Sequence, residues 1–250
     1  MQIELRGKVA LVTGAAHRVG RAIAVELARQ GADILAHYHS AGEELARDAE
    51  REIKSSGVAA HSVRADLAQP AEIESLFAAL QDRFGRLDIV VNNAAIFQAR
   101  DLLAVSLADW DMTMAVNLRA PFLVTQQAAR LMARNALPGG VIINICDAGA
   151  NGPWRQYPHH GISKSALWML TQVSALSLGP AIRVNAIAPG PVMKTAGREI
   201  SDEDWARVGM RSALQKTGTA DDVARAVVYL CREDHITGAL LQVNGGEHLR

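Results

Sequence analysis

The segment "VTGAAHRVGRAIA", residues 12–24, joins an aliphatic run to an amphipathic pattern and indicates the fold of the surrounding chain. The run that leads into it, "KVALVT" (8–13), is typical of a buried strand, whereas "VGRAIAVELARQ" (19–30) predicts a helix. Gly14 and Gly20 bracket a turn that directs backbone N–H groups and a helix N-terminus toward an anion such as a pyrophosphate. Two glycines alone indicate only a tight turn, but the strand before them and the helix after them favour a dinucleotide site.

Outward from this turn, short aliphatic runs alternate with longer helical patterns. This alternation predicts an α/β fold with a parallel, doubly wound Rossmann-type sheet and right-handed crossovers. No linker or charge block divides the 250 residues, so we expect a single domain over 1–250. Between 191 and 218 the pattern gives way to a polar segment, which we interpret as a mobile lid, helical in part. Further strands are predicted at 32–39, 60–66, 87–93, 140–147, 182–189 and 239–245, and helices at about 41–55, 70–83, 107–133, 157–178 and 220–231.

Local signals mark several of these helices. Ser106 with Asp109, and Thr219 with Asp222, have the spacing of residues that cap a helix N-terminus. Pro121 lies inside the long predicted helix 107–133 and is expected to bend it.

The composition excludes several classes of function. Lys and Arg together number 26, as do Asp and Glu, so the formal net charge is zero and nothing favours nucleic acid or an anionic membrane as a partner. Cys146 and Cys231 form no disulfide framework and lack metal-ligand spacing, so we expect no metal site and two buried thiols in a reducing cytoplasm. Neither a signal peptide nor a membrane-spanning run is evident, and a small-molecule substrate is the expected partner.

The end of the second predicted strand bears on the choice of cofactor. An NAD site usually has an acidic residue here, whereas "AHYHS" (36–40) has none, which permits a 2′-phosphate. Arg18 can supply positive charge, and His39 and Ser40 can donate hydrogen bonds, so NADP(H) is the expected cofactor. In the alternative interpretation Arg18 is solvated and His39 merely ends a strand. Asp66 could accept from the adenine amine or serve only as a turn residue.

Several motifs together resemble the short-chain dehydrogenase/reductase family over nearly the whole chain. They are "TGAAHRVG", "NNAA", Asn117 in "VNLRAPF", the lysine of "HHGISK" and "PGPV" (189–192), in order and at family spacing. The resemblance implies a seven-stranded sheet, a lid after strand six, and a homotetramer built on the helices around 107–133 and 157–178. The residues expected at the cofactor are Gly14, His17, Arg18, Val19, Gly20, His37, Tyr38, His39, Ser40, Asp66, Leu67, Asn93, Ala94, Lys164, Pro189, Gly190 and Val192.

Three features narrow the resemblance to the pteridine reductase branch. Arg18 replaces the middle glycine of the usual loop, "HYH" occupies 37–39, and Asp147 follows the fifth predicted strand. In that branch an aromatic residue after the "NNA" motif stacks on the pterin ring, and Phe97 occupies this position; alternatively, Phe97 is a packed loop residue. Ala95 stands where those reductases often have a serine, a departure that bears on pterin hydrogen bonding.

The catalytic helix departs from the family pattern at one position. The family tetrad is Asn, Ser, Tyr and Lys; Asn117 and Lys164 match, Asp147 stands at the serine and His160 at the tyrosine. His160 and Lys164 are four apart and so share a helix face. A histidine, which ordinarily titrates near pH 6.5, is close to working pH, and Asp147 would favour its charged form while Lys164 would oppose it.

These residues predict an NADPH-dependent reductase of a pteridine-like or other small carbonyl or imine substrate. His160 is the expected proton donor, and Tyr157, one turn earlier, is a second candidate for that role. The expected substrate contacts are Phe97, Asp147, Tyr157 and His160. The alternative is a nucleotide-binding sensor or subunit whose turnover is weakened or lost because His160 replaces tyrosine.

Overall fold

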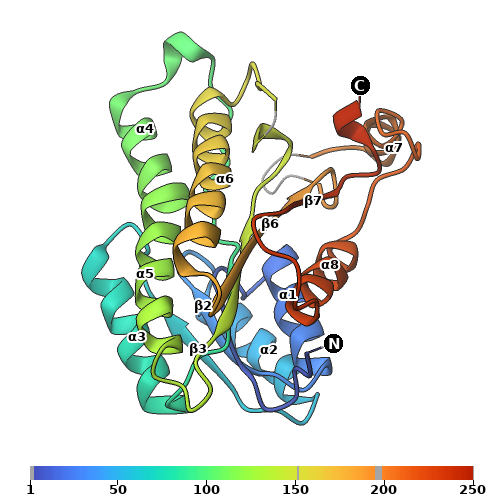
Figure 1. Cartoon of the computed structure of the whole chain (residues 1–250). Helices are drawn as coiled ribbons and strands as arrows, with labels where there is room; N and C mark the ends of the chain where they lie inside the picture. The colour runs from blue at the N-terminus through green and yellow to red at the C-terminus, as the bar shows by residue number, and fades with distance from the viewer. Residues whose placement is uncertain (1–2, 151, 195–198, 250) are drawn as a thin grey trace.

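The computed structural model of the chain describes residues 3–150, 152–194 and 199–249. It contains a parallel seven-stranded sheet in the order β3-β2-β1-β4-β5-β6-β7, which confirms the doubly wound fold (Figure 1). The strands are β1 Val9–Val12, β2 Asp33–Tyr38, β3 Ala60–Arg64, β4 Ile89–Asn92, β5 Gly140–Ile145, β6 Ile182–Pro189 and β7 Leu240–Val243.

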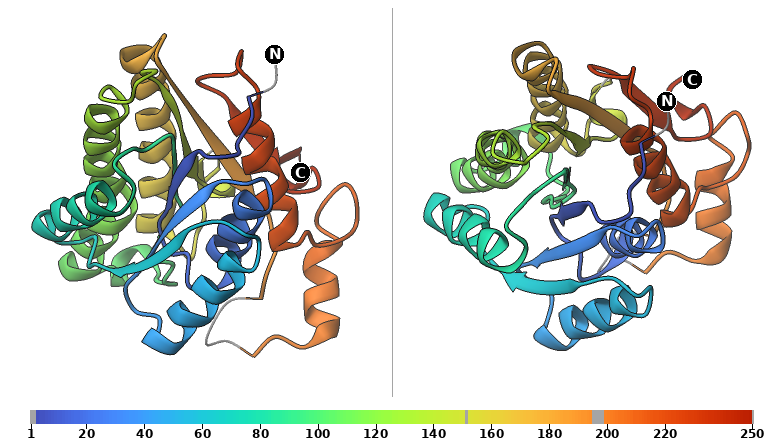
Figure 2. Two further views of the ribbon diagram at one scale, coloured as in Figure 1. Left: turned by 90° about the horizontal axis from the view of Figure 1, so that it is seen from below. Right: turned by 60° about the horizontal axis from the view of Figure 1, so that its bottom comes forward.

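Helices cover both faces of the sheet (Figure 2). One face is covered by α1, α2 and α8, and the other by α3, α4, α5 and α6 (Figure 1). The helices are α1 Arg18–Arg29, α2 Glu43–Lys54, α3 Pro70–Phe84, α4 Leu107–Met114, α5 Ala120–Met132, α6 Pro158–Leu178, α7 Asp202–Gly209 and α8 Ala220–Arg232.

The central strands β1, β4 and β5 are largely aliphatic because they are buried on both sides, whereas the edge strands β3 and β7 are only partly buried. In β1, Ala10 and Val12 pack in the core on the side of α1 and α8, whereas Leu11 between them packs with α3 and α5. Successive side chains of a strand point to opposite faces, so a sheet with helices on both faces needs apolar residues at every position. Because all seven strands are parallel, their carboxyl ends lie at one edge of the sheet. The candidate site residues follow these ends.

The long helix predicted over 107–133 contains an irregular turn. Between α4 and α5 lies a π-helical turn, Ala115–Arg119. Pro121 has no N–H for the carbonyl of Asn117 four residues earlier, so a regular α-helix cannot pass through this point. The irregularity therefore coincides with Asn117, whose side chain is fully buried. The capping boxes predicted at Ser106 with Asp109 and at Thr219 with Asp222 are confirmed.

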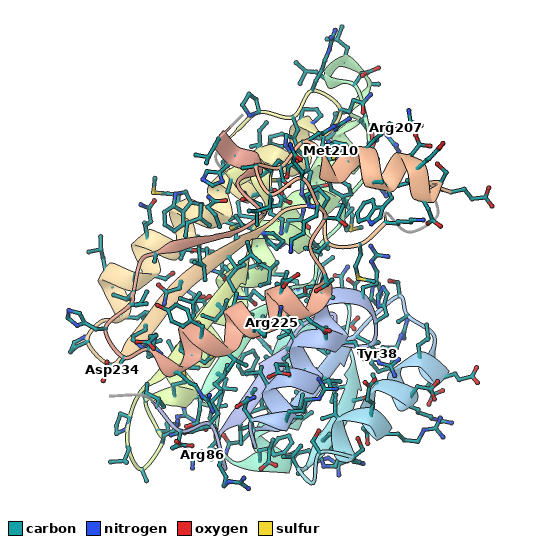
Figure 3. The ribbon with its side chains drawn as sticks, turned by 90° about the vertical axis from the view of Figure 1, so that its right-hand side faces the viewer. Tyr38, Arg86, Arg207, Met210, Arg225 and Asp234 are labelled. Carbon is teal, nitrogen blue, oxygen red and sulfur yellow. The ribbon has the colours of Figure 1, made fainter. Side chains whose placement is uncertain are left out.

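The segment predicted as a lid contains α7 and packs against the C-terminal end of the chain. The Leu214 N–H donates to the carbonyl of Gly245 at 3.0 Å. Figure 3 shows Arg207 on α7 and Met210 at the opposite end of the molecule from Arg86, which precedes β4. Part of the predicted lid, 195–198, lies outside the described residues. Within the described parts of the chain, every helix is too short or too polar to span a membrane.

Candidate active site

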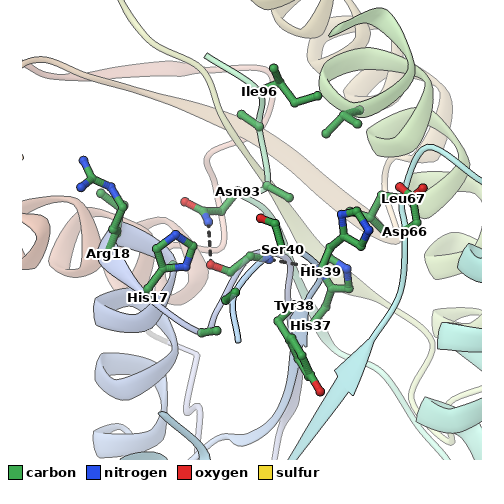
Figure 4. Close-up of a pocket in the computed structure, with 18 of the residues that line it drawn as sticks. His17, Arg18, His37, Tyr38, His39, Ser40, Asp66, Leu67, Asn93 and Ile96 are labelled. Atoms are coloured by element: carbon green, nitrogen blue, oxygen red, sulfur yellow. Dashed lines mark hydrogen bonds between the residues drawn. The ribbon is translucent and has the colours of Figure 1, made fainter. Parts of the chain in front are cut away.

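The glycine loop between β1 and α1 is held against the start of the segment that follows β4. Asn93 donates from Nδ2 to the carbonyl of Thr13 at 2.9 Å, and its own N–H donates to the Thr13 hydroxyl at 2.9 Å. The same Nδ2 contacts the carbonyl of Gly14 at 3.4 Å (Figure 4). A Cβ atom at Gly20 would lie 2.1 Å from the carbonyl oxygen of Gly14, and Gly14 itself has φ +69°. Only glycine fits at either position, so the two glycines are required by the turn itself.

His37 supports the glycine loop through a hydrogen bond to its backbone. Its Nδ1 accepts from the N–H of Gly14 at 3.1 Å, and its Nε2–H donates to the carbonyl of Ala65 at 2.9 Å. Burial lowers the pKa of His37 to about 4, so the imidazole is neutral near pH 7. The N–H of Gly14 is therefore bound to His37 and is not one of the loop groups that point toward an anion. His37 was expected at the cofactor, and the structure gives it this supporting role.

A cavity of about 390 Å³ lies between the glycine loop and the end of β2. In Figure 4, His17 and Arg18 lie on one side of it and His39, Asp66 and Leu67 on the other. The predicted cofactor residues that line it are Gly14, His17, Arg18, Val19, Gly20, His37, Tyr38, His39, Ser40, Asp66, Leu67, Asn93 and Ala94. Sequence reasoning missed six lining residues, which carry no polar signal of their own: Ala16, Ala41, Ala95, Ile96, Met112 and Val116.

Four other predicted cofactor residues lie away from this cavity. Lys164 is on α6, and Pro189 is the last residue of β6. The N–H of Gly190 donates to the carbonyl of Val243 at 3.0 Å, and Val192 packs on the core beside α1 and α8.

Arg18 has an unusual backbone conformation at the edge of the cavity. Its φ of +56° is in the left-handed region that favours glycine, the residue usual at this position. For a residue with a side chain this conformation costs roughly 1–2 kcal/mol. Its guanidinium donates to the carbonyl of Lys194 at 2.7 Å and thereby joins the glycine loop to the segment after β6. Asp66, on the far side, accepts from the N–H of Ala68 at 2.9 Å, as a turn residue does.

His160 and Asp147 form a pair beyond the cavity. The Nε2 of His160 lies 2.5 Å from Oδ2 of Asp147, and its Nδ1 lies 2.9 Å from the carbonyl oxygen of Ile96. The same Nδ1 lies 3.3 Å from the amide Nδ2 of Asn117. The carbonyl of Ile96 is nearer and can only accept, which favours the tautomer in which Nδ1 carries a proton and donates it to Ile96. The predicted proximity of His160 and Asp147 is thus present. The contact with Ile96 was not predicted, because a backbone carbonyl gives no signal in the sequence.

Asn117 fixes the position of Ile96 relative to α6. Its Oδ1 accepts from the N–H of Ile96 at 2.8 Å, and its Nδ2 donates to the carbonyl of Ile96 at 3.0 Å and to the hydroxyl of Ser163 at 3.1 Å. Asn117 belongs to the π-helical turn and its side chain is buried. Because Asn117 and His160 both bind the backbone of Ile96, this segment links the irregular helical turn to the orientation of His160.

Lys164 lies one turn after His160, as the spacing predicted, and is almost fully buried. Its ammonium donates to the carbonyl of Ile145, the last residue of β5, at 2.7 Å. Cys146 follows directly, and burial raises the pKa of this thiol to about 12, so it is neither a nucleophile nor an acid near pH 7. Both cysteines are free and buried, as predicted.

An aromatic cluster encloses His160. Phe97 stacks on Tyr157 with ring centroids 4.2 Å apart and planes 8° apart, and it contacts His160 edge-on at 4.7 Å. Trp154 lies parallel to the imidazole of His160 at 6.1 Å. Sequence reasoning missed Trp154, although its place three residues before Tyr157 in "PWRQYP" is a signal. Tyr157 is paired with Phe97 in this structure.

Comparison with known proteins agrees with this geometry. Residues 14–248 match the family described as enoyl-(acyl carrier protein) reductase. A short-chain type dehydrogenase/reductase of Picea abies is 34% identical and covers 97% of this chain and 93% of its own length. A 3-oxoacyl-[acyl-carrier-protein] reductase FabG of Aquifex aeolicus is 36% identical and covers 98% of this chain and 99% of its own length.

Solved structures give the same result. A blue fluorescent protein from a metagenomic library, in complex with NADPH, is 34% identical with a TM-score of 0.89, covering 98% of this chain and 99% of its own. FolM alternative dihydrofolate reductase 1 from Brucella canis, complexed with NADP, is 31% identical with a TM-score of 0.89. The match covers 99% of this chain and 97% of the FolM chain. The chain therefore belongs to the short-chain dehydrogenase/reductase family, which consists of oxidoreductases.

Proposed function

We propose that this protein is an NADP(H)-dependent reductase of a planar carbonyl or imine compound of the pterin kind. The observation that carries the proposal is the 2.5 Å contact of His160 with Asp147 beside the Phe97 ring, because it puts a proton source next to an aromatic face. Similarity to a FolM dihydrofolate reductase complexed with NADP supports the cofactor and the substrate class. The family assignment and the proton-holding pair favour an enzyme over a silent sensor.

The residues present fit NADP(H). The cavity combines a glycine loop, a helix N-terminus and, at the end of β2, a segment without an acidic residue. The thirteen predicted cofactor residues that line the cavity would hold the adenosine and phosphate groups, His37 through its support of the glycine loop. Lys164 with Pro189, Gly190 and Val192 would hold the nicotinamide half. When bound, the reduced nicotinamide supplies a hydride to the substrate.

The chain's own residues supply the remaining needs of the reaction. His160 and Asp147 hold a proton for the substrate oxygen or nitrogen, Asn117 keeps Ile96 and hence His160 in place, and Phe97 provides a flat apolar surface. We place the protein in the cytoplasm, because its two buried free thiols suit a reducing compartment.

The direct test is the oxidation of NADPH in the presence of pterins, quinones and ketones, followed by absorbance. We expect turnover with at least one pterin. If the protein binds NADPH well but oxidises it with none of these compounds, it is the nucleotide-binding sensor instead.

NADPH is expected to bind more tightly than NADH, by about ten- to a hundredfold, because a charge-assisted contact to phosphate is worth about 1.5–3 kcal/mol. The 2′-phosphate would draw the Arg18 guanidinium from the Lys194 carbonyl, since a charged acceptor is the stronger one. Arg18→Ala should remove most of the preference. Arg21→Ala is the matched control, because Arg21 is on the same helix and pairs with Glu52 at 2.6 Å. Equal dissociation constants of the parent for both cofactors would rule the idea out.

Phe97→Ala is expected to raise the KM of a planar substrate by about two- to tenfold, the equivalent of a ring contact worth about 0.5–1.5 kcal/mol, with NADPH affinity nearly unchanged. Tyr229→Ala, at an exposed position on α8, is the control. If substrate and NADPH weaken alike, Phe97 is a packing residue and the pterin assignment loses its support.

We also propose a homotetramer. The described face of α4, α5 and α6 exposes large apolar side chains, as expected for a surface covered by further copies of the chain: Leu107, Phe122, Met169, Val173 and Leu176. Sedimentation of the purified protein measures the oligomeric state, and a monomer at micromolar concentration would contradict the proposal.

A further inference from the structure

His159 is a buried histidine that the proposed reaction does not use. Its side chain has no exposed surface, and neither ring nitrogen has a hydrogen-bond partner among the described residues. A neutral imidazole has one N–H that donates and one nitrogen that accepts, so both needs go unmet. Buried polar groups are nearly always hydrogen-bonded, and the exception at His159 calls for an explanation from its surroundings.

The register of α4 and α6 shows what surrounds His159. The two helices lie side by side and run in the same direction, since each leads from the carboxyl edge of a parallel sheet back toward its next strand (Figure 1). Asn117, in the turn that continues α4, donates to the hydroxyl of Ser163 on α6 at 3.1 Å. One turn earlier stand Thr113, the buried residue of α4, and His159 on α6. The hydroxyl of Thr113 likewise has no hydrogen-bond partner in the described parts of the chain.

Asp109, one further turn back on the same face of α4, holds the end of the β4–α4 loop, residues 93–106. Its carboxylate accepts from the hydroxyl of Ser106 at 2.8 Å and from the N–H of Ser106 at 3.3 Å. It also accepts from Nε and Nη2 of Arg100, each at 3.3 Å. The N–H of Arg100 donates to the carbonyl of Gln156, just before α6, at 2.8 Å. One carboxylate thus fastens both this loop and the start of α4.

The charged and titratable groups that act on His159 come from α4, from the β4–α4 loop and from α6 itself. Burial, the largest effect, lowers the pKa of His159 below its ordinary value of 6.5; Asp109 opposes this, and His160 and Arg100 add to it. The pKa of Asp109 is also below its ordinary value, chiefly because the hydroxyl of Ser106 donates to it. The carboxylate therefore stays charged at the pH at which the imidazole takes up a proton.

We propose that His159 is an acid-sensitive release for the β4–α4 loop. When His159 takes up a proton, both of its N–H groups need acceptors, and Asp109 is the anionic acceptor on the facing side of α4. A carboxylate has about four lone pairs with which to accept, and Ser106 and Arg100 already use four. A charged imidazole draws the carboxylate away from these donors, so the loop loosens. Phe97 lies in this loop and loosens with it.

The direction and size of the effect follow from proton linkage. In the released loop His159 titrates near 6.5, whereas the closed loop holds its pKa lower, so acid favours release. The closed loop has its full advantage above pH 6.5 and loses it as pH falls toward the pKa of the closed form. Because one proton is involved, the population of released loop at pH 5.5 exceeds that at pH 8 by up to about tenfold.

Hydrogen–deuterium exchange, measured by mass spectrometry on the cofactor-free protein, tests this release. Between pH 8 and pH 5.5 the parent should lose protection over residues 97–106 by up to about tenfold, after correction for the intrinsic pH dependence of exchange. His159→Gln, which takes up no proton, should keep the same protection at both pH values. Asp109→Asn should show low protection already at pH 8, because a neutral amide is a weaker acceptor for Arg100. His235→Gln, at an exposed position in the turn before β7, is the control and should match the parent.

If His159→Gln loses protection on acidification as the parent does, another group drives the release and the inference is wrong. A parent that keeps its protection at pH 5.5 also contradicts it. Thermal melting at pH 8 shows whether His159→Gln is folded. If that variant does not fold, nitrogen-15 NMR of the parent decides, since the imidazole of His159 must titrate over the pH range in which protection is lost.

The consequence for the substrate rests on the proposed reductase function. With a compound that supports NADPH oxidation, the KM of the parent should rise more between pH 8 and pH 5.5 than the KM of His159→Gln. Equal changes in the two proteins would separate the loop from the substrate site and overturn the link to Phe97. A folded parent without turnover on any tested compound contradicts the proposed function, and the exchange measurement then still decides the release.

Discussion

Replacing His160 with alanine is expected to lower turnover by about 10²–10⁴-fold, the usual contribution of a positioned proton-transfer group, with NADPH binding retained. The expectation follows from the 2.5 Å contact with Asp147, since the alanine variant has no imidazole to store the transferable proton. The cofactor cavity has no His160 in its lining, so binding there should be spared. Steady-state kinetics and NADPH fluorescence titration measure the two properties separately.

His235→Ala is the matched control, because His235 is exposed in the turn before β7. An alanine variant that turns over as fast as the parent would remove His160 from the mechanism and turn attention to Tyr157 or water. His160→Tyr restores the family residue, but the larger ring must displace Phe97 or Trp154, which enclose the site. We therefore expect tyrosine alone to restore less activity than the family pattern suggests.

The second large effect is expected in stability at acidic pH and arises from His37. Its pKa is about 4 in the folded protein and 6.5 when unperturbed, so the unfolded chain binds the proton more readily. The stabilising contribution is complete above pH 6.5 and is lost as pH falls toward 4. At about 1.4 kcal/mol per unit, the loss is about 3 kcal/mol.

His37→Gln should remove this dependence while costing about 1–2 kcal/mol near pH 8, because the contacts with Gly14 and Ala65 are weakened. Urea unfolding of parent and variant at pH 8 and pH 4.5 gives the two differences. His39→Gln, two residues on and exposed, controls for the loss of a histidine. If parent and His37→Gln lose the same stability on acidification, the buried imidazole does not drive the pH dependence.

Much of the candidate site could be predicted because it follows from local signals. The residues of the cofactor cavity sit at the carboxyl ends of predicted strands, and a parallel sheet brings those ends together whatever the details of packing. Asp147 and His160 were paired through the strand-five end and the helix that follows. Trp154, Ile96 and the apolar lining residues were not predicted, since neither a backbone carbonyl nor an alanine has a distinctive pattern.

The role of a predicted residue was harder to infer than its position. Arg18 was expected to face a phosphate, and in the structure it donates to Lys194, 176 residues away in the chain. His37 was expected at the cofactor; it lines the cavity, and its two nitrogens join Gly14 and Ala65. Side chains with several polar atoms take whichever partners the packed chain supplies, and those partners are distant in sequence.

The sequence by itself determined the parallel sheet, the capped helices, the glycine turn and the family. Aliphatic periodicity, capping pairs and positive-φ glycines act over a few residues. Their effect can therefore be predicted from the sequence without knowledge of the tertiary contacts. Only the tertiary structure decided that His160 is turned away from solvent, with Nδ1 on Ile96 and Nε2 on Asp147. Those partners are 64 and 13 residues away, and a proton's position depends on which oxygen atoms packing brings within hydrogen-bonding distance.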